Sequence, residues 1–91
     1  MASKLTVPQA YRKVVGISGV TVTERLRKTD DTSWYFGFVY KRNFYDVYFT
    51  TFIDLQALIK RFTISQGGNV ILMGPPSDFT AERIRKSLRL T

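Results

Sequence analysis

The stretch from Trp34 to Phe49 reads WYFGFVYKRNFYDVYF and decides the fold. Nine of its sixteen residues are aromatic, and one basic pair interrupts the run. Aromatic residues favour strands, and two strands separated by so short a connection must pair as an antiparallel hairpin. We therefore predict strands over 34–41 and 44–51. Arg42-Asn43 is predicted to form the tight turn between them, because asparagine tolerates a positive φ.

Alternation with a period of two divides this hairpin into two faces. The more apolar set is assigned to the core and comprises Trp34, Phe36, Phe38, Tyr40, Tyr45, Val47 and Phe49. The remaining set is assigned to the outer face and comprises Tyr35, Gly37, Val39, Lys41, Phe44, Asp46, Tyr48 and Thr50. A register error of one residue would exchange the two faces.

The N-terminal part predicts a short helix and one more strand. Pro8 suits the first turn of a helix over 8–15, and Gly16 ends it. From residue 20 apolar and polar residues alternate, which predicts a half-buried strand to about residue 27. Its inward side chains are predicted to be Val20, Val22 and Leu26, with Glu24 as the one exception to the pattern.

The C-terminal part predicts helix, strand and helix. Asp54 can cap a helix in which Leu55, Leu58, Ile59 and Phe62 recur at helical spacing. The apolar run 70–73 is predicted to be a buried strand that Gly74-Pro75-Pro76 stops. Ser77 or Asp78 is predicted to cap a last helix with Ala81, Ile84 and Leu88 facing inward.

These elements follow the order α-β-β-β-α-β-α. We predict an α+β fold: a small, mainly antiparallel sheet of three to four strands with helices packed on one face. The chain of 91 residues fits a single domain, 1–91, and its 44% hydrophobic content is enough for a modest core. No apolar run is long enough for a membrane span or a signal peptide, so we expect a soluble, non-secreted, cytoplasmic protein.

The residue types argue against catalysis. The chain has no cysteine, so it has no thiolate nucleophile and no cysteine zinc site, and the absence of histidine removes the commonest general base and metal ligand. The segment GGNVILMGPPS lacks the spacing of a phosphate-binding loop, and the Asp30-Asp31 pair is explained by a turn. We therefore expect no enzyme activity, no cofactor and no metal site.

The charge points to a polyanionic partner. Fourteen Lys and Arg against seven Asp and Glu give a net charge of +7 and a basic pI. Such a charge attracts nucleic acid first, an acidic protein next and an anionic membrane third. Our leading hypothesis is a small nucleic-acid-binding protein, with DNA and RNA both open.

Three groups of residues are the candidate interface. The outer sheet face offers Arg25, Arg27, Tyr35, Lys41 and Tyr48, where rings can stack on bases and cations can pair with phosphates. Arg42 extends this group to the hairpin turn. The last helix offers Arg83, Arg85, Lys86 and Arg89, which repel one another unless an anion neutralises them.

Other readings stay open. Exposed antiparallel faces carry Thr, Arg, Lys and Tyr without any ligand, and a cross-strand Lys41–Asp46 pair would account for two of the charges. Tyrosine and arginine also suit protein interfaces, so a protein-interaction module or inhibitor, of the kind found among phage and viral accessory proteins, is the alternative. A homodimer built through the sheet is a further one.

Overall fold

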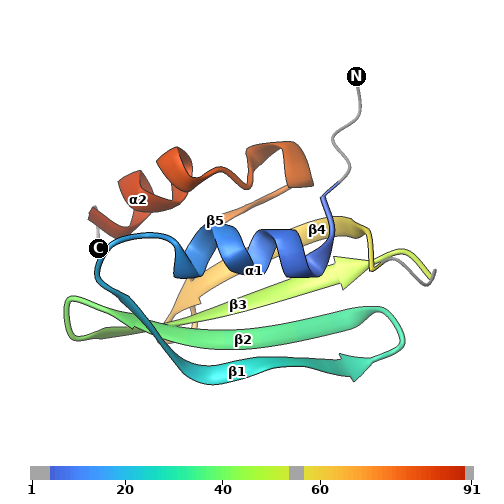
Figure 1. Cartoon of the computed structure of the whole chain (residues 1–91), viewed down its shortest axis with the longest axis horizontal. Coiled ribbons are helices and arrows are strands. Elements are labelled where there is room, and N and C mark those ends of the chain that lie inside the picture. The colour runs from blue at the N-terminus through green and yellow to red at the C-terminus, as the bar shows by residue number, and fades with distance from the viewer. Residues whose placement is uncertain (1–4, 54–56, 90–91) are drawn as a thin grey trace.

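The computed structural model describes residues 5–53 and 57–89 of the chain (Figure 1). The elements follow the order α1 (Val7–Val15), β1 (Val20–Asp30), β2 (Ser33–Tyr40), β3 (Asn43–Thr51), β4 (Ile59–Gln66), β5 (Asn69–Gly74), η1 (Pro76–Asp78) and α2 (Ala81–Arg89). The fold is therefore α+β, as predicted. Its sheet has five strands in the order β1-β2-β3-β4-β5, one or two more than expected, and every pairing is antiparallel.

The hairpin over residues 34–49 has the two predicted faces, although its turn lies one residue earlier than predicted. Phe36 lies opposite Val47 and Phe38 opposite Tyr45, so the aromatic core face is continuous across β2 and β3. The phenyl rings of Phe36 and Phe49 stack with their centroids 6.0 Å apart, and those of Phe38 and Tyr45 lie 5.1 Å apart. All five side chains are buried, which confirms the face assignment.

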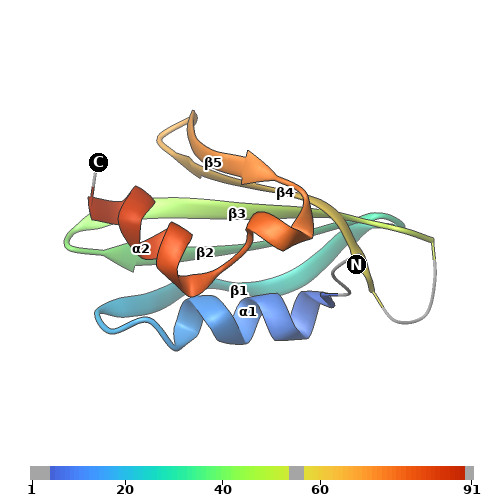
Figure 2. The same cartoon turned by 90° about the horizontal axis from the view of Figure 1, so that it is seen from above.

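Both helices cover this one face of the sheet (Figures 1 and 2). From α1, the Tyr11 ring packs against Phe36 in a T-shaped arrangement with the ring centroids 5.0 Å apart, and Val14 is fully buried. Phe79, between η1 and α2, packs its ring against those of Phe49 and Phe62, with centroid distances of 5.5 Å and 4.8 Å. The opposite face of the sheet, here called the outer face, is left uncovered by either helix.

The predicted helix over residues 55–62 is wrong from Ile59 onward, where β4 begins. Asp54 and Leu55 lie outside the described residues. In β4, Phe62 and Ile64 are buried opposite Phe49 and Val47, and the intervening Thr63 points to the outer face. A shift of register where β3 meets the start of β4 places Ile59 in the core as well, and this produced the apparent helical spacing.

The run predicted as a buried strand is β5, but it lies at the edge of the sheet. A two-residue turn joins it to β4, with φ of 56° at Gly67 and 86° at Gly68, the left-handed values that glycine adopts at little cost. Val70 and Met73 are half exposed on the outer face. The strand is therefore buried on its helix side only.

A bulge in β1 accounts for the misplaced Glu24. The register shifts between Val22 and Glu24, so Val22 still faces the core opposite Phe38 while Glu24 faces outward opposite Gly37. Glu24, which strict alternation would place on the core side, is therefore exposed to solvent. Leu26 packs against the core, as predicted.

The helix ends follow from local chemistry. Thr6 and Gln9 form a capping box at the start of α1, and Gly16 ends that helix. The cap of α2 is Thr80 rather than Ser77 or Asp78, since its hydroxyl accepts a 3.2 Å hydrogen bond from the Arg83 amide. Within the described ranges, no helix is long and apolar enough to cross a membrane.

Candidate nucleic-acid interface

The outer face carries a row of side chains that crosses all five strands. Cross-strand pairing aligns this row as Arg27, Tyr35, Tyr48, Thr63 and Met73, from β1 to β5. The rings of Tyr35 and Tyr48 lie 5.1 Å apart at a tilt of 39°, and the guanidinium carbon of Arg27 lies 4.8 Å from the Tyr35 ring centre. The predicted tyrosines are thus neighbours, with one predicted arginine beside them.

Tyr35 is already engaged within the sheet. Its hydroxyl donates a 2.7 Å hydrogen bond to Asp46 Oδ1 on β3. Its ring leans over Gly37, where a Cβ atom would stand 3.1 Å from the Tyr35 hydroxyl. Burial, followed by the hydrogen bond and the negative charge of Asp46, raises the pKa of Tyr35 to about 12. Tyr35 is therefore held neutral and in place, while Tyr48 remains 49% exposed.

The charges of the outer face are partly balanced. Arg27 approaches Glu24 at 3.6 Å, and both side chains are more than half exposed. The Lys41–Asp46 pair, raised as an alternative explanation of the charges, is not a cross-strand pair, because Asp46 lies opposite Gly37 and Lys41 belongs to the turn beyond the strand. Arg25 is exposed in β1. It lies between Glu24 and Arg27, where the β1–β2 register shifts again, and no residue of β2 lies directly opposite it. Two carboxylates in the middle of this face make it a poor surface for phosphate.

The β2–β3 turn consists of two cations in a strained conformation. The strands end at Tyr40 and resume at Asn43, so the turn is Lys41-Arg42, one residue earlier than predicted. The pairing of core residues across β2 and β3, such as Phe36 with Val47, places the turn at Lys41 and Arg42. Lys41 has φ 51° and Arg42 has φ 68°. Such left-handed values are usual for Asn-Gly in a type I′ turn and cost about 1 kcal/mol or more for other residues.

The cations of α2 divide into two groups. Arg83 Nη1 bonds Asp78 Oδ1 at 2.7 Å, which ties the helix to η1. Arg85, Lys86 and Arg89 are exposed, and among the described residues no carboxylate lies within ion-pair distance of them. Ile84 and Leu88 anchor the opposite side of the helix in the core.

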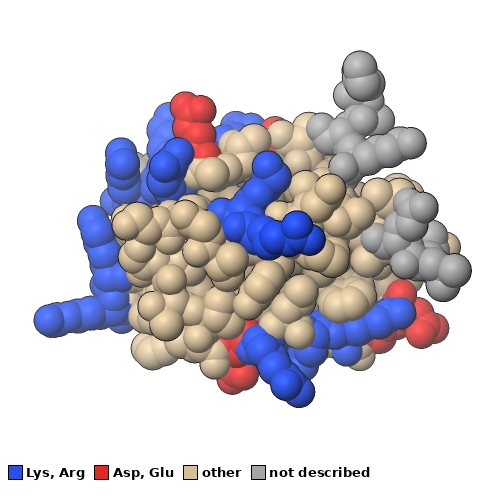
Figure 3. Space-filling view, in the orientation of Figure 1, with Lys and Arg blue, Asp and Glu red and all other residues tan. Residues whose placement is uncertain are grey.

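The turn and the helix meet at the same end of the molecule. Figures 1 and 2 both place the β2–β3 hairpin tip and the last turn of α2 at the left, and Lys and Arg gather over these elements in Figure 3. We call this surface the basic end and define it as Lys41, Arg42, Arg85, Lys86 and Arg89. Two groups of cations that lie more than forty residues apart in the sequence therefore form one cationic surface.

Sequence reasoning missed several exposed residues. Arg12 and Lys13 of α1 are exposed and line a shallow hollow with Leu5 and Gln9. The helical periodicity of α1 would have predicted their exposure, since both cations lie away from the side of the helix that carries the buried Ala10 and Val14. The exposure of Val70 and Met73 differs from the prediction of a buried strand over 70–73.

Among the described residues, no three or more His, Cys, Asp or Glu side chains are placed so that they could hold a metal ion. No protein-family model matches the chain, no curated protein matches it, and no solved structure matches it. A functional proposal therefore has to be built from the chemistry of the surfaces described above.

Proposed function

We propose that this chain is a small, non-enzymatic nucleic-acid-binding protein of the cytoplasm that holds phosphate groups at its basic end. The observation that carries the proposal is the convergence of Lys41-Arg42 with Arg85, Lys86 and Arg89 at one end of the molecule, where five cations outnumber the one nearby carboxylate among the described residues of α2, Glu82. Guanidinium groups bind phosphate oxygens in a bidentate manner, and ammonium groups add point charges. DNA and RNA both present this chemistry.

The backbone of the Lys41-Arg42 turn supports the proposal independently. A two-residue hairpin turn is easily filled by Asn-Gly at lower conformational cost. Two exposed cations occupy it instead, and the Lys41 ammonium lies 5.5 Å from the centre of the Tyr40 ring. Strained residues that persist in a well-paired hairpin are typical of functional positions.

The sheet tyrosines have a smaller role in this proposal than the sequence suggested. The Tyr35 hydroxyl is hydrogen-bonded to Asp46, and Arg27 forms an ion pair with Glu24. Tyr48 retains a free ring face on which an unpaired base can stack. Stacking on Tyr48 would therefore add to binding at the basic end without replacing it.

A salt titration tests the proposal. Fluorescent duplex and single-stranded DNA and RNA oligonucleotides are titrated with the protein at several salt concentrations. If the five cations each neutralise one duplex phosphate, the logarithm of the association constant falls against that of the salt concentration with a slope of about −4.5. Affinity that does not depend on salt, or no binding to any of the four ligands, contradicts the proposal.

Matched variants locate the surface. Lys41→Gln/Arg42→Gln and Arg85→Gln/Arg89→Gln each remove two charges from the basic end. Lys28→Gln/Arg61→Gln removes the same charge from exposed positions on β1 and β4. We expect each of the first two pairs to lower affinity about tenfold or more and to reduce the salt slope by about 2, and the control to change little. Equal losses in all three would show that only net charge matters.

A second candidate is a protein-interaction module that uses the outer face. Phe44 and Tyr48 are 66% and 49% exposed there, beside the balanced charges of Arg27 and Glu24. Aromatic side chains and arginine are enriched among the residues that dominate protein interfaces. Sedimentation of the wild type and of Phe44→Ser/Tyr48→Ser separates this candidate from the first. A homodimer that dissociates in the variant, while nucleic-acid affinity stays unchanged, would favour it.

A further inference from the structure

The two edges of the sheet differ in how they meet solvent. The β1 edge is interrupted by three register shifts and carries Glu24, Arg25, Arg27 and Lys28. Bulges and charges of this kind keep an edge strand from pairing with another chain. The β5 edge has a single register shift and no charged residue from Asn69 to Gly74. Among the described residues, β5 pairs with β4 alone, so its outer edge is open to one more strand.

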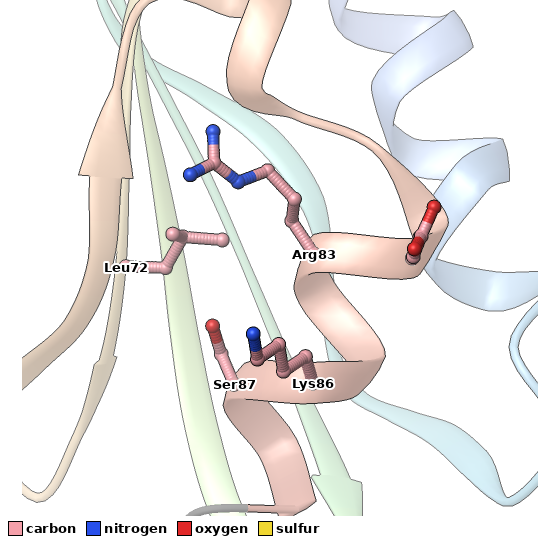
Figure 4. Close-up of a pocket in the computed structure, with 5 residues that line it drawn as sticks. Leu72, Arg83, Lys86 and Ser87 are labelled. Atoms are coloured by element: carbon pink, nitrogen blue, oxygen red, sulfur yellow. The ribbon is translucent and has the colours of Figure 1, made fainter.

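A groove lies beside this open strand, between β5 and α2. It has a volume of about 330 Å³ and is lined by Leu72 from β5 and by Glu82, Arg83, Lys86 and Ser87 from α2. Figure 4 shows Arg83, Lys86 and Ser87 extending from the helix toward the strand that carries Leu72. The bulge in β5 turns both Ile71 and Leu72 toward the helix side, where they pack against the core.

We propose that β5 accepts an extended, acidic peptide segment of a partner protein as a sixth strand. Backbone groups of the segment would pair with the free edge of β5. Every second side chain would then point toward α2 and enter the groove. Leu72 supplies an apolar floor, and Lys86 and Arg83 supply cations at the rim.

The positive charge of α2 favours an acidic segment as the strand that pairs with β5. The nine residues of α2 contain four cations and one carboxylate, Glu82, so a chain laid along this helix experiences a positive potential. Arg83 keeps its bond to Asp78 and offers its remaining donors, whereas Lys86 has no ion-pair partner among the described residues. A second copy of this protein joined edge to edge through β5 would bring two such helices together. The resulting repulsion disfavours a dimer and favours a segment that carries carboxylates.

A model peptide tests the proposal without a known partner. The probe is a capped peptide of alternating glutamate and valine, long enough to pair along the six residues of β5. Its matched control replaces each glutamate by lysine. Binding is followed by fluorescence polarisation and by two-dimensional NMR of the labelled protein. We expect the acidic peptide to bind, with amide shifts centred on 69–74 and on α2. The lysine peptide is expected to bind at least about tenfold more weakly.

Backbone pairing is tested by N-methylation of the probe. Alternate amides of a strand point to opposite edges, so methylation of the glutamate amides blocks one edge and methylation of the valine amides blocks the other. We expect one of the two methylated peptides to lose binding and the other to keep it. If both bind like the parent peptide, the contact is purely electrostatic and strand addition is wrong.

Two protein variants separate peptide binding at the groove from nucleic-acid binding at the basic end. Lys86 belongs to both surfaces, so its variant is tested with the peptides alone. Lys86→Glu reverses an exposed charge at the groove and is expected to invert the preference between the two peptides. Lys41→Gln/Arg42→Gln is expected to leave peptide binding unchanged while it weakens nucleic-acid binding. The proposal is overturned if neither peptide binds at millimolar concentration, or if the shifts map to β1 or to the hairpin tip. Concentration-dependent shifts on β5 without peptide would instead assign the edge to a second copy.

Discussion

The Tyr35 hydroxyl and the Asp46 carboxylate are joined by a 2.7 Å hydrogen bond between β2 and β3. This bond spans the outer face beside Gly37, the buried glycine that lies directly opposite Asp46. It converts the tyrosine from a ring that could stack on a ligand into a clamp that holds two strands together.

The bond predicts a pH-dependent contribution of Tyr35 to stability. The pKa of Tyr35 is about 12 in the folded protein, above the ordinary value of 10.0, chiefly through burial and then through Asp46. A raised pKa means that this stabilisation is complete below about pH 10 and is lost as the pH rises toward 12. Unfolding by urea across this range should show a smaller loss of stability in Tyr35→Phe than in wild type.

NMR of the tyrosine Cζ carbons checks the cause. We expect Asp46→Asn to lower the pKa of Tyr35 while leaving it above 10, since burial, the largest cause, remains. Tyr48→Phe serves as the control and should move the midpoint much less. An unchanged midpoint in Asp46→Asn would show that the hydrogen bond does not act on the titration.

The position of Gly37 predicts the effect of a methyl group on this clamp. A Cβ at Gly37 would stand 3.1 Å from the Tyr35 hydroxyl and 3.2 Å from Glu24 Cβ. We expect Gly37→Ala to push the Tyr35 side chain away from Asp46, to lower the pKa of Tyr35 and to reduce the free energy of unfolding by about 1 kcal/mol. Denaturation and the same NMR titration measure both. Retention of the high pKa would mean that the strands move apart instead.

The left-handed turn predicts opposite effects on stability and binding. Lys41→Asn/Arg42→Gly supplies the residues that a type I′ turn prefers and should stabilise the fold by about 1–2 kcal/mol, as read from the urea midpoint. The same variant should bind nucleic acid more weakly. Lys41→Gln/Arg42→Gln keeps the strain and removes the charge, so it should lose binding without the gain in stability. A Lys41→Asn/Arg42→Gly protein that is no more stable than wild type would refute the strain argument.

The helix cap predicts a contrast between two nearby hydroxyl residues. Thr80 accepts the Arg83 amide at the start of α2, so Thr80→Ala should lower the free energy of unfolding by about 1 kcal/mol. Ser77 belongs to η1, before the helix, and Ser77→Ala should change it by less than about 0.5 kcal/mol. The reverse order would place the helix start at the position that the sequence suggested.

The contact of Phe79 with the sheet predicts how α2 is held. Its ring meets Phe49 and Phe62, and the side chain is almost fully buried. Phe79→Ala should therefore cost about 3–5 kcal/mol, measured by urea denaturation, and Phe79→Leu considerably less. Hydrogen exchange in Phe79→Ala should show α2 losing protection before β2 and β3. Uniform loss of protection would indicate that helix and sheet unfold as one unit.

The sequence predicted the central hairpin well because its signal is local. Alternating aromatic residues determine both faces at once, and the buried set from Phe36 to Phe49 matches the expectation. The end of the molecule where Lys41-Arg42 meets α2 could not be predicted in the same way. That proximity depends on the direction of α2 across the sheet, which no short stretch of sequence specifies.

The β4–β5 hairpin shows where a stronger signal was overlooked. Ile59 and Phe62 fit helical spacing only because a register shift brings Ile59 to the core side. The pair Gly67-Gly68 lies between two runs that contain the β-branched pairs Thr63-Ile64 and Val70-Ile71. This is a hairpin signal and would have favoured a strand before the pair. The edge position of β5 also follows from this hairpin, since no later strand remains among the described residues to cover it.

The simple meander of the sheet has a kinetic consequence. Each strand pairs with the strand next to it in the chain, so the sheet can grow by closing one short connection at a time. The exception is the start of the described chain, where Leu5 and Val7 exchange hydrogen bonds of 2.9 Å and 3.0 Å with Ile59 and Ala57. This contact closes a loop of more than fifty residues. We therefore expect the successive hairpins to form early during folding and the segment before α1 to lock against β4 among the last events.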